Sequence, residues 1–260
     1  QSEQIYLVTG DQRKKSANWG TEHVMFEFIL IRHLYRICKI RVHYQCYNFS
    51  MKELVIFDMD GVIVQTHQTS GAVMREVVKD IFNIEATDAD LKNFYGISDY
   101  EFYSEIIART GSNLLLDTVL EQQFARYNHR LKNEVAATDG IAALIHELAR
   151  IHQIAICSGS TRAQVDVVID RFNLRDHIAM SMSCDDVQKG KPDPEGYLVI
   201  LDTLGVEPGS AIAVEDSPAG IEAAKAAGIE VIGFDNGLSQ DITAATYQIS
   251  NIRDVVQLIH

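Results

Sequence analysis

Proline and paired cysteines are scarce in this chain of 260 residues. Four prolines and 16 glycines are too few for a collagen-like or Pro/Gly-rich disordered protein. The four cysteines (Cys38, Cys46, Cys157 and Cys184) form no CxxC pair and have no metal-ligand spacing. We therefore expect neither a disulfide scaffold nor a zinc site. We expect a reduced, cytoplasmic protein.

Long apolar runs and excess positive charge are also missing. The apolar run at residues 24–34 is interrupted by Glu27, Arg32 and His33, well short of the ~18–20 residues of a membrane span. Against 23 Lys and Arg stand 36 Asp and Glu, a net charge of −13. This balance opposes binding to nucleic acid and to anionic membranes, so we expect neither as a partner.

The first fifty residues differ in composition from the rest. Residues 1–50 contain seven basic and four acidic residues, whereas residues 51–260 have a net charge of −16. All four prolines and 14 of the 16 glycines follow Met51, which directly precedes the first clear strand pattern. We therefore predict that residues 1–50 are an extension outside the domain, and we hypothesise that they are not native coding sequence.

Short, continuously apolar runs alternate with helical patterns after residue 51. Runs without polar alternation are typical of parallel strands covered on both faces. The expected strands are Leu54–Asp58, Ile154–Cys157, Ala211–Val214, Val231–Phe234 and, more weakly, Ile178–Met180. The expected helices between them are Ile141–Arg150, Ala163–Phe172, Glu195–Leu204 and Ala219–Ala227. This order predicts an α/β fold with a doubly wound, Rossmann-like parallel sheet.

The interval after the first expected strand is too long for one crossover. A strand–helix–strand unit needs ~30 residues, but Asp58 and Ser158 are 100 residues apart. Residues 66–137 contain no clear strand and three helical stretches, Ser70–Phe82, Tyr100–Thr110 and Thr118–Lys132. We predict a helical cap over 66–137, inserted into a core made of 51–65 and 138–260.

Chemically capable side chains follow the expected strands. The set comprises Asp58, Asp60 and Gly61 after the first strand, Ser158, Gly159 and Ser160 after the next, Lys191 in a later loop, and Glu215 and Asp216. Ligands of open α/β sheets bind at such strand ends. Four acids at one point repel one another, and a hard cation such as Mg²⁺ relieves that repulsion. Lysine and the amides of Gly159 and Ser160 suit a phosphate oxygen, so the set favours phosphoryl transfer.

These motifs, in this order, resemble the haloacid dehalogenase (HAD) superfamily, and most closely its small phosphatases and β-phosphoglucomutases with a helical cap. The resemblance covers residues 51–260. It implies Asp58 as nucleophile, Asp60 as general acid–base and Lys191 and Ser158 as ligands of the phosphoryl group, with Gly61, Gly159 and Ser160 lining the phosphate site. It also implies Mg²⁺ held by Asp58, the backbone carbonyl of Asp60, and Asp216. Glu215 would either bind the ion directly or contact it through one of its ligands.

Two departures weaken the mutase alternative. Ser70 stands where the mutases carry a histidine in the first cap helix, and the stretch around Gly96 lacks their arginine. We expect a Mg²⁺-dependent phosphatase of a small phosphorylated metabolite, a sugar or polyol phosphate, acting as a monomer or weak dimer. A phosphosugar mutase, or a catalytically silent binding protein on the same scaffold, remains the alternative. Gly96–Ser98 is a candidate substrate-facing loop.

Overall fold

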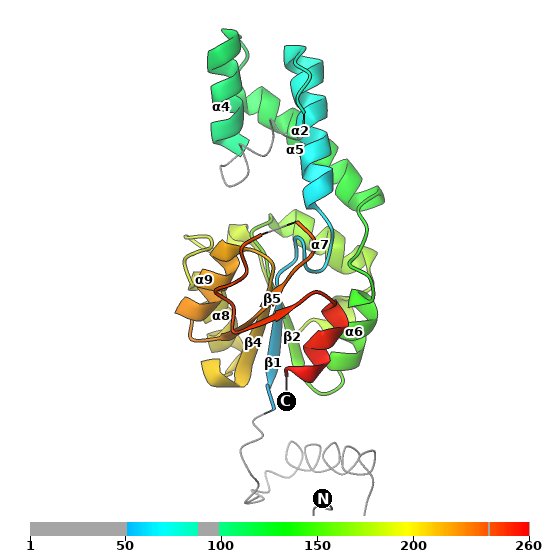
Figure 1. Cartoon of the computed structure of the whole chain (residues 1–260), viewed down its shortest axis with the longest axis vertical. Coiled ribbons are helices and arrows are strands. Elements are labelled where there is room, and N and C mark those ends of the chain that lie inside the picture. Colours follow the sequence, from blue (N-terminus) through cyan, green and yellow to red (C-terminus); the bar gives the residue numbers. More distant parts are fainter. Residues whose placement is uncertain (1–50, 88–98, 239, 260) are drawn as a thin grey trace, which may run out of the picture. The chain divides into compact units, whose positions relative to one another are not determined.

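The computed structural model describes residues 51–87, 99–238 and 240–259. The predicted extension (residues 1–50) and the candidate loop Gly96–Ser98 lie outside these residues. Strands and helices alternate as the sequence predicts (Figure 1). Within the described ranges, no helix is both long and apolar enough to cross a bilayer.

Six parallel strands form one sheet in the order β3-β2-β1-β4-β5-β6. The strands are β1 (Leu54–Phe57), β2 (Gln153–Cys157), β3 (Met180–Met182), β4 (Ala211–Glu215), β5 (Glu230–Phe234) and β6 (Tyr247–Ile249). The weak candidate Ile178–Met180 was placed two residues too early, and β6 was not predicted. Central β1 and β4 are buried at every position, which confirms the doubly wound, Rossmann-like class.

Helices cover both faces of the sheet. They are α6 (Ile141–Leu148), α7 (Arg162–Arg171), α8 (Glu195–Leu204) and α9 (Pro218–Ala226), with 3₁₀ turns η1 (Arg175–His177), η2 (Cys184–Asp186), η3 (Pro208–Ser210) and η4 (Ile252–Gln257). Alternate β1 side chains divide between two cores: Val55 and Phe57 pack with α6 and α7, Leu54 and Ile56 with α8 and α9.

Local signals fix where these helices begin and end. The Ser217 hydroxyl accepts a hydrogen bond from the Gly220 amide, and Pro218 occupies the first helical position of α9. Helix α8 ends at Gly205, whose φ of 65° is the left-handed conformation expected of a C-terminal glycine. The Ser217 cap begins α9 directly after Glu215 and Asp216, so it fixes the turn that carries these two acids.

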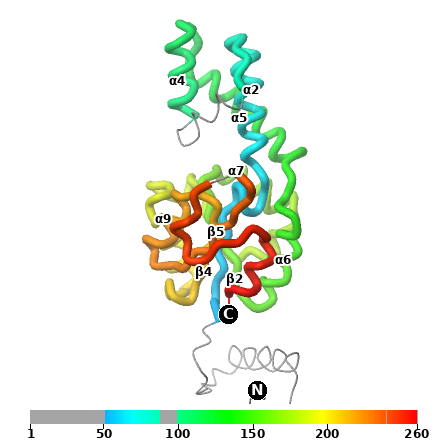
Figure 2. The backbone as a smooth tube through the Cα atoms, viewed as in Figure 1, coloured from blue at the N-terminus to red at the C-terminus, as the bar shows by residue number. Residues whose placement is uncertain are grey.

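Three helices fill the long interval after β1: α2 (His67–Phe82), α4 (Asp99–Thr110) and α5 (Leu116–Asn133). The chain leaves the sheet after β1, passes through these helices and returns through α6 (Figure 2). The helices share their own apolar cluster, which includes Val73, Val77, Phe102 and Tyr103. The segment therefore has a core of its own, as expected of a cap, although the boundaries 65/66 and 137/138 stay a prediction.

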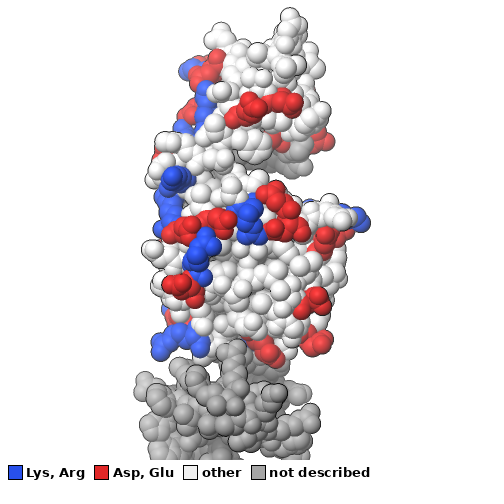
Figure 3. Space-filling model, turned by 180° about the vertical axis from the view of Figure 1, so that it is seen from behind, with Lys and Arg blue, Asp and Glu red and all other residues white. Residues whose placement is uncertain are grey.

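Basic and acidic side chains lie beside one another on the surface of the described residues (Figure 3). Arg130 pairs with Glu76, Arg126 with Asp80 at 2.7 Å, and Arg253 with Glu147 at 2.8 Å. Exposed pairs of this kind contribute little stability each. On the face shown, positive and negative side chains are mixed, so no broad area carries charge of one sign only.

Candidate active site

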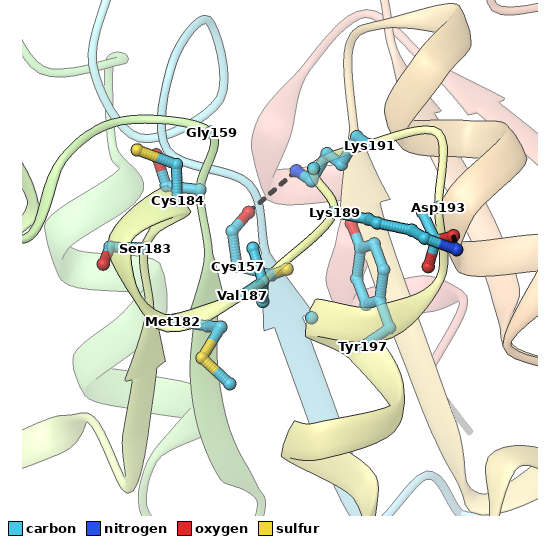
Figure 4. Close-up of a pocket in the computed structure, with 13 residues that line it drawn as sticks. Cys157, Gly159, Met182, Ser183, Cys184, Val187, Lys189, Lys191, Asp193 and Tyr197 are labelled. Atoms are coloured by element: carbon cyan, nitrogen blue, oxygen red, sulfur yellow. Dashed lines mark hydrogen bonds and ion pairs between the residues drawn. The ribbon is translucent and has the colours of Figure 1, made fainter.

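Lys191 joins the ends of two central strands. Its Nζ donates to Asp58 Oδ1, directly after β1, and to Glu215 Oε1, the last residue of β4, each at 2.5 Å. A third hydrogen bond, of 2.8 Å, reaches the Cys157 carbonyl oxygen at the end of β2, beside a cavity of about 30 Å³ (Figure 4). Because parallel strands end at one edge, residues 24 and 133 positions away from Lys191 meet there.

Asp58, Glu215 and Asp216 form one buried carboxylate group. Each offers an oxygen, and these oxygens lie within 4.8 Å of one another. Asp58, Glu215 and Asp216 are 6%, 0% and 2% exposed. Burying three ionisable acids without compensation is unfavourable, so their proximity requires positive charge.

Two glycines make room for these acids. A Cβ at Gly220 would lie 2.0 Å from Glu215 Oε2, and one at Gly61 would lie 2.0 Å from Asp216 Oδ2. Gly61 also has a φ of 82°, a conformation that other residues rarely adopt. The two glycines thus let the backbone of α9 and of the turn after β1 approach the carboxylates closely.

Burial and mutual repulsion act on the charges of the site. Burial raises the pKa of Asp58 well above its usual range, Glu215 and Asp216 raise it further, and Lys191 opposes them. Burial alone would lower the pKa of Lys191, but Asp58 and Glu215 hold it well above the usual value. Lys191 is therefore a fixed ammonium ion, and the acids around it still outnumber it.

The donor set fits Mg²⁺. Mg²⁺ prefers carboxylate and carbonyl oxygens together with retained waters, and the three acids offer only hard oxygen atoms. Among the described residues no cysteine or histidine belongs to this group. Asp58, Asp216 and Glu215 are the side chains that would hold the ion, and its charge would offset the excess of carboxylates.

The carboxyl group of Asp60 is surrounded by hydroxyl groups. Its Oδ2 accepts from Ser160 Oγ at 2.7 Å and from Ser158 Oγ at 3.3 Å. Its Oδ1 accepts from the Tyr127 hydroxyl on α5 at 3.4 Å. All three partners of the Asp60 carboxyl group are therefore hydroxyls. Asp60 does not belong to the group of three carboxylates whose oxygens lie within 4.8 Å of one another.

The predicted phosphate-binding amides differ in availability. Nothing lies within 4 Å of a Cβ built on Gly159, so open space surrounds it. The Ser160 amide, in contrast, donates to Ser158 Oγ at 2.9 Å, and the Gly61 amide donates to the Val64 carbonyl at 2.7 Å. Of these three residues, Gly159 leaves the most space for a phosphate group to approach.

Four side chains near the site were not predicted. The Tyr197 hydroxyl donates to Glu215 Oε1 at 2.6 Å, and Asn236 Nδ2 donates to Asp216 Oδ2 at 2.8 Å. His67 Nε2 lies 3.0 Å from the same Asp216 oxygen, and Tyr127 contacts Asp60. Reading the residues after Val231–Phe234, as was done for the other strands, would have found Asn236.

Cys157 and Arg162 have structural environments that account for them without a role in the chemistry. Cys157 is 4% exposed, and burial raises the pKa of its thiol to about 12, which does not suit a nucleophile. Arg162 donates to the Ser181 hydroxyl at 2.7 Å and pairs with Asp186, so its charge is used on the surface.

A parallel α/β sheet, a helical insertion after the first strand and a lysine–carboxylate cluster at the strand ends define a capped, Rossmann-like protein. The sequence profile described as haloacid dehalogenase-like hydrolase matches residues 55–234. The chain belongs to this family.

Similar proteins include named phosphatases. The chain is 29% identical to validoxylamine A 7'-phosphate phosphatase of Streptomyces hygroscopicus subsp. limoneus, over 71% of this chain and 86% of that one. It is 27% identical to a phosphorylated carbohydrates phosphatase of Thermotoga maritima, over 69% and 83%. The crystal structure of CbbY from Rhodobacter sphaeroides in complex with phosphate has the same fold (TM-score 0.67, 22% identity, 79% and 96% covered).

Proposed function

We propose that this protein is a Mg²⁺-dependent phosphatase of a small phosphorylated metabolite, a sugar or polyol phosphate, acting through an aspartyl-phosphate. The observation that carries the proposal is the buried group Asp58, Glu215 and Asp216 with Lys191 Nζ 2.5 Å from two of its members. A nucleophilic carboxylate, further acids for a cation and a fixed ammonium are the requirements of phosphoryl transfer. Phosphatases among the similar proteins support this choice.

In the first step the Asp58 carboxylate attacks phosphorus, and the bond from phosphorus to the leaving oxygen breaks. Asp60, two residues further on, donates a proton to that oxygen. Lys191 binds the phosphoryl oxygens, and Ser158 and the Gly159 amide approach them from the end of β2. A bound Mg²⁺ supplies further neutralisation of charge on the transferring group.

In the second step a water molecule attacks phosphorus of the aspartyl-phosphate. Asp60 accepts its proton, inorganic phosphate leaves, and the Asp58 carboxylate is restored. Having donated its proton to the leaving group in the first step, Asp60 is the carboxylate needed here, and Ser160 and Ser158 remain its hydrogen-bond partners. One side chain thereby serves as acid and then as base without moving to a new partner.

The cap selects the substrate in this proposal. Its helices follow β1 directly, and its side chains His67 and Tyr127 contact carboxylates of the site. A cap that closes over the substrate would exclude water and competing acceptors. We further propose a cytoplasmic monomer or weak dimer; the free thiols Cys157 and Cys184 agree with a reducing compartment.

The test is release of inorganic phosphate from a panel of sugar, polyol and aryl phosphates, with Mg²⁺ and then with excess chelator. We expect release that requires Mg²⁺ and that returns when the ion is restored. Conversion of β-glucose 1-phosphate without free phosphate would assign the mutase alternative instead. Tight binding of a phosphate ester with no turnover would identify a silent binding protein.

A further inference from the structure

Two side chains of the cap contact carboxylates of the core. His67, the first residue of α2, lies with Nε2 3.0 Å from Asp216 Oδ2. Tyr127, on α5, donates from its hydroxyl to Asp60 Oδ1 at 3.4 Å. Asp216 is one of the proposed metal ligands and Asp60 is the proposed general acid–base, so the cap contacts residues of both functions.

Each of these carboxylates also has a partner from the core. Asn236, after β5, donates to the same Asp216 oxygen at 2.8 Å, and Ser160, after β2, donates to Asp60 Oδ2 at 2.7 Å. Ser158 also donates to Asp60 Oδ2, at 3.3 Å. Each acid is therefore held between the core and one side chain of the cap. Hydrogen bonds of this kind orient a carboxylate and so direct its remaining oxygen surface.

The two linkers of the cap are joined to each other. The Gln65 amide donates to the Ala136 carbonyl and the Thr138 amide to the Ile63 carbonyl, each at 2.9 Å. Movement of the cap about this joint would shift His67, which follows it by two residues, relative to Asp216. Asn236 and Ser160 belong to the core and would stay in place.

We propose that His67 and Tyr127 are positioning residues, through which the cap orients the metal-ligating carboxylate of Asp216 and the acid–base carboxylate of Asp60. This inference rests on the proposed function. Its consequence is reciprocal: if the position of the cap alters the affinity for Mg²⁺, then Mg²⁺ alters the position of the cap by the same coupling free energy.

His67→Ala and Asn236→Ala form a matched pair, because each removes one partner of the same oxygen. Titration calorimetry with Mg²⁺ alone should show a roughly 10–100-fold weaker affinity in both. His129→Ala, an exposed histidine of α5, should leave the affinity unchanged. His67→Gln, which keeps a donor, should recover part of the loss, whereas a merely structural defect would not be rescued.

The position of the cap distinguishes the effect of His67→Ala from that of Asn236→Ala. Leu115 in the cap and Glu207 in the core are exposed. Replacing each by a residue that takes a spin label without a thiol allows the distance between cap and core to be measured. We expect Mg²⁺ to change the distance distribution in the parent protein and in Asn236→Ala, but not in His67→Ala. An unchanged Mg²⁺ affinity in His67→Ala, or the same distance response in both variants, would overturn the inference for Asp216.

Tyr127→Phe and Ser160→Ala form the second pair, on Asp60. Tyr127→Phe should lower kcat several-fold while KM and the melting temperature stay near the parent values; a lower melting temperature with unchanged kcat would contradict a positioning role. The Mg²⁺ and distance measurements need no substrate. They therefore decide the part concerning His67 even if the protein releases no phosphate, in which case only the proposed function fails.

Discussion

The α/β core and the helical cap differ in how completely they bury their apolar side chains. In the core, every residue of β1 and β4 is buried, and two apolar clusters cover the sheet from both faces. In the cap, one cluster joins three helices, and Tyr100 and Leu115 are 62% and 74% exposed, whereas the most exposed large apolar side chain among the described core residues, Leu198, is 46% exposed. Close packing leaves side chains little freedom, so the better-packed region suits the chemistry that we propose.

The strongest test of this division is Asp58→Asn in the core. Asparagine keeps the size of the side chain but cannot act as the carboxylate nucleophile, so we expect the turnover of an aryl phosphate to fall by roughly 10⁴-fold or more. Circular dichroism and the melting temperature should show a folded protein. Steady-state kinetics with Mg²⁺ present measures the loss.

Asp170→Asn is the matched control for that variant. Asp170 is an exposed core aspartate at the end of α7, and its partner is Arg175 at 2.6 Å. Such a surface pair contributes little, so this variant should keep full activity. Equal turnover in Asp58→Asn and Asp170→Asn would remove Asp58 from its proposed role.

The core site was predictable because its residues obey a rule of topology. Asp58, Ser158 and Glu215 each stand at or directly after the end of a continuously apolar strand, and parallel strands end at one edge. Lys191 lies in a loop, not at a strand end, and was predicted from its motif alone. The structure places its Nζ beside both Asp58 and Glu215. The cap contacts of His67 and Tyr127 follow no such rule, because they depend on how the cap packs on the core.

Whether the two regions unfold together is tested by a pair of phenylalanines. Phe57 in β1 is 0% exposed and Phe102 in α4 is 2% exposed. Replacing either by alanine should cost about 3–5 kcal/mol. We expect Phe57→Ala to destabilise the whole protein and Phe102→Ala to destabilise mainly α2, α4 and α5.

Hydrogen exchange measured by mass spectrometry distinguishes local from global opening. In Phe102→Ala, amides of the cap helices should exchange faster while those of β1 and β4 keep their protection. In Phe57→Ala, protection should fall throughout the described residues. Equal loss in both variants would mean that the cap and the core form one cooperative unit.

The edges of the sheet were predicted less well than its centre. Strand β3 pairs through Met180–Met182, where Ser181 interrupts the apolar run, and β6 contains exposed Tyr247 and Gln248. Edge strands are buried incompletely, so their sequences lack the continuous apolar pattern that identified β1, β2, β4 and β5. Fully buried strands are therefore predictable from hydrophobicity, and edge strands depend on their pairing partner.

The smallest effect is expected for Tyr197→Phe, which tests how closely the core controls its acids. Burial and the nearby Glu215 carboxylate raise the pKa of Tyr197 well above its usual value, so its hydroxyl remains a donor to Glu215 Oε1. The variant deletes one hydrogen bond to a charged group, a change of about 1.5–3 kcal/mol, without altering the packing of α8. Glu215 keeps Lys191 but can turn, so we expect weaker Mg²⁺ binding in calorimetry and a lower melting temperature. Tyr247→Phe, on the exposed strand β6, is the matched control and should change neither. If Tyr197→Phe behaves like Tyr247→Phe, then Lys191 alone orients Glu215. The Tyr197 hydroxyl would then contribute nothing to how the core holds its carboxylates in place.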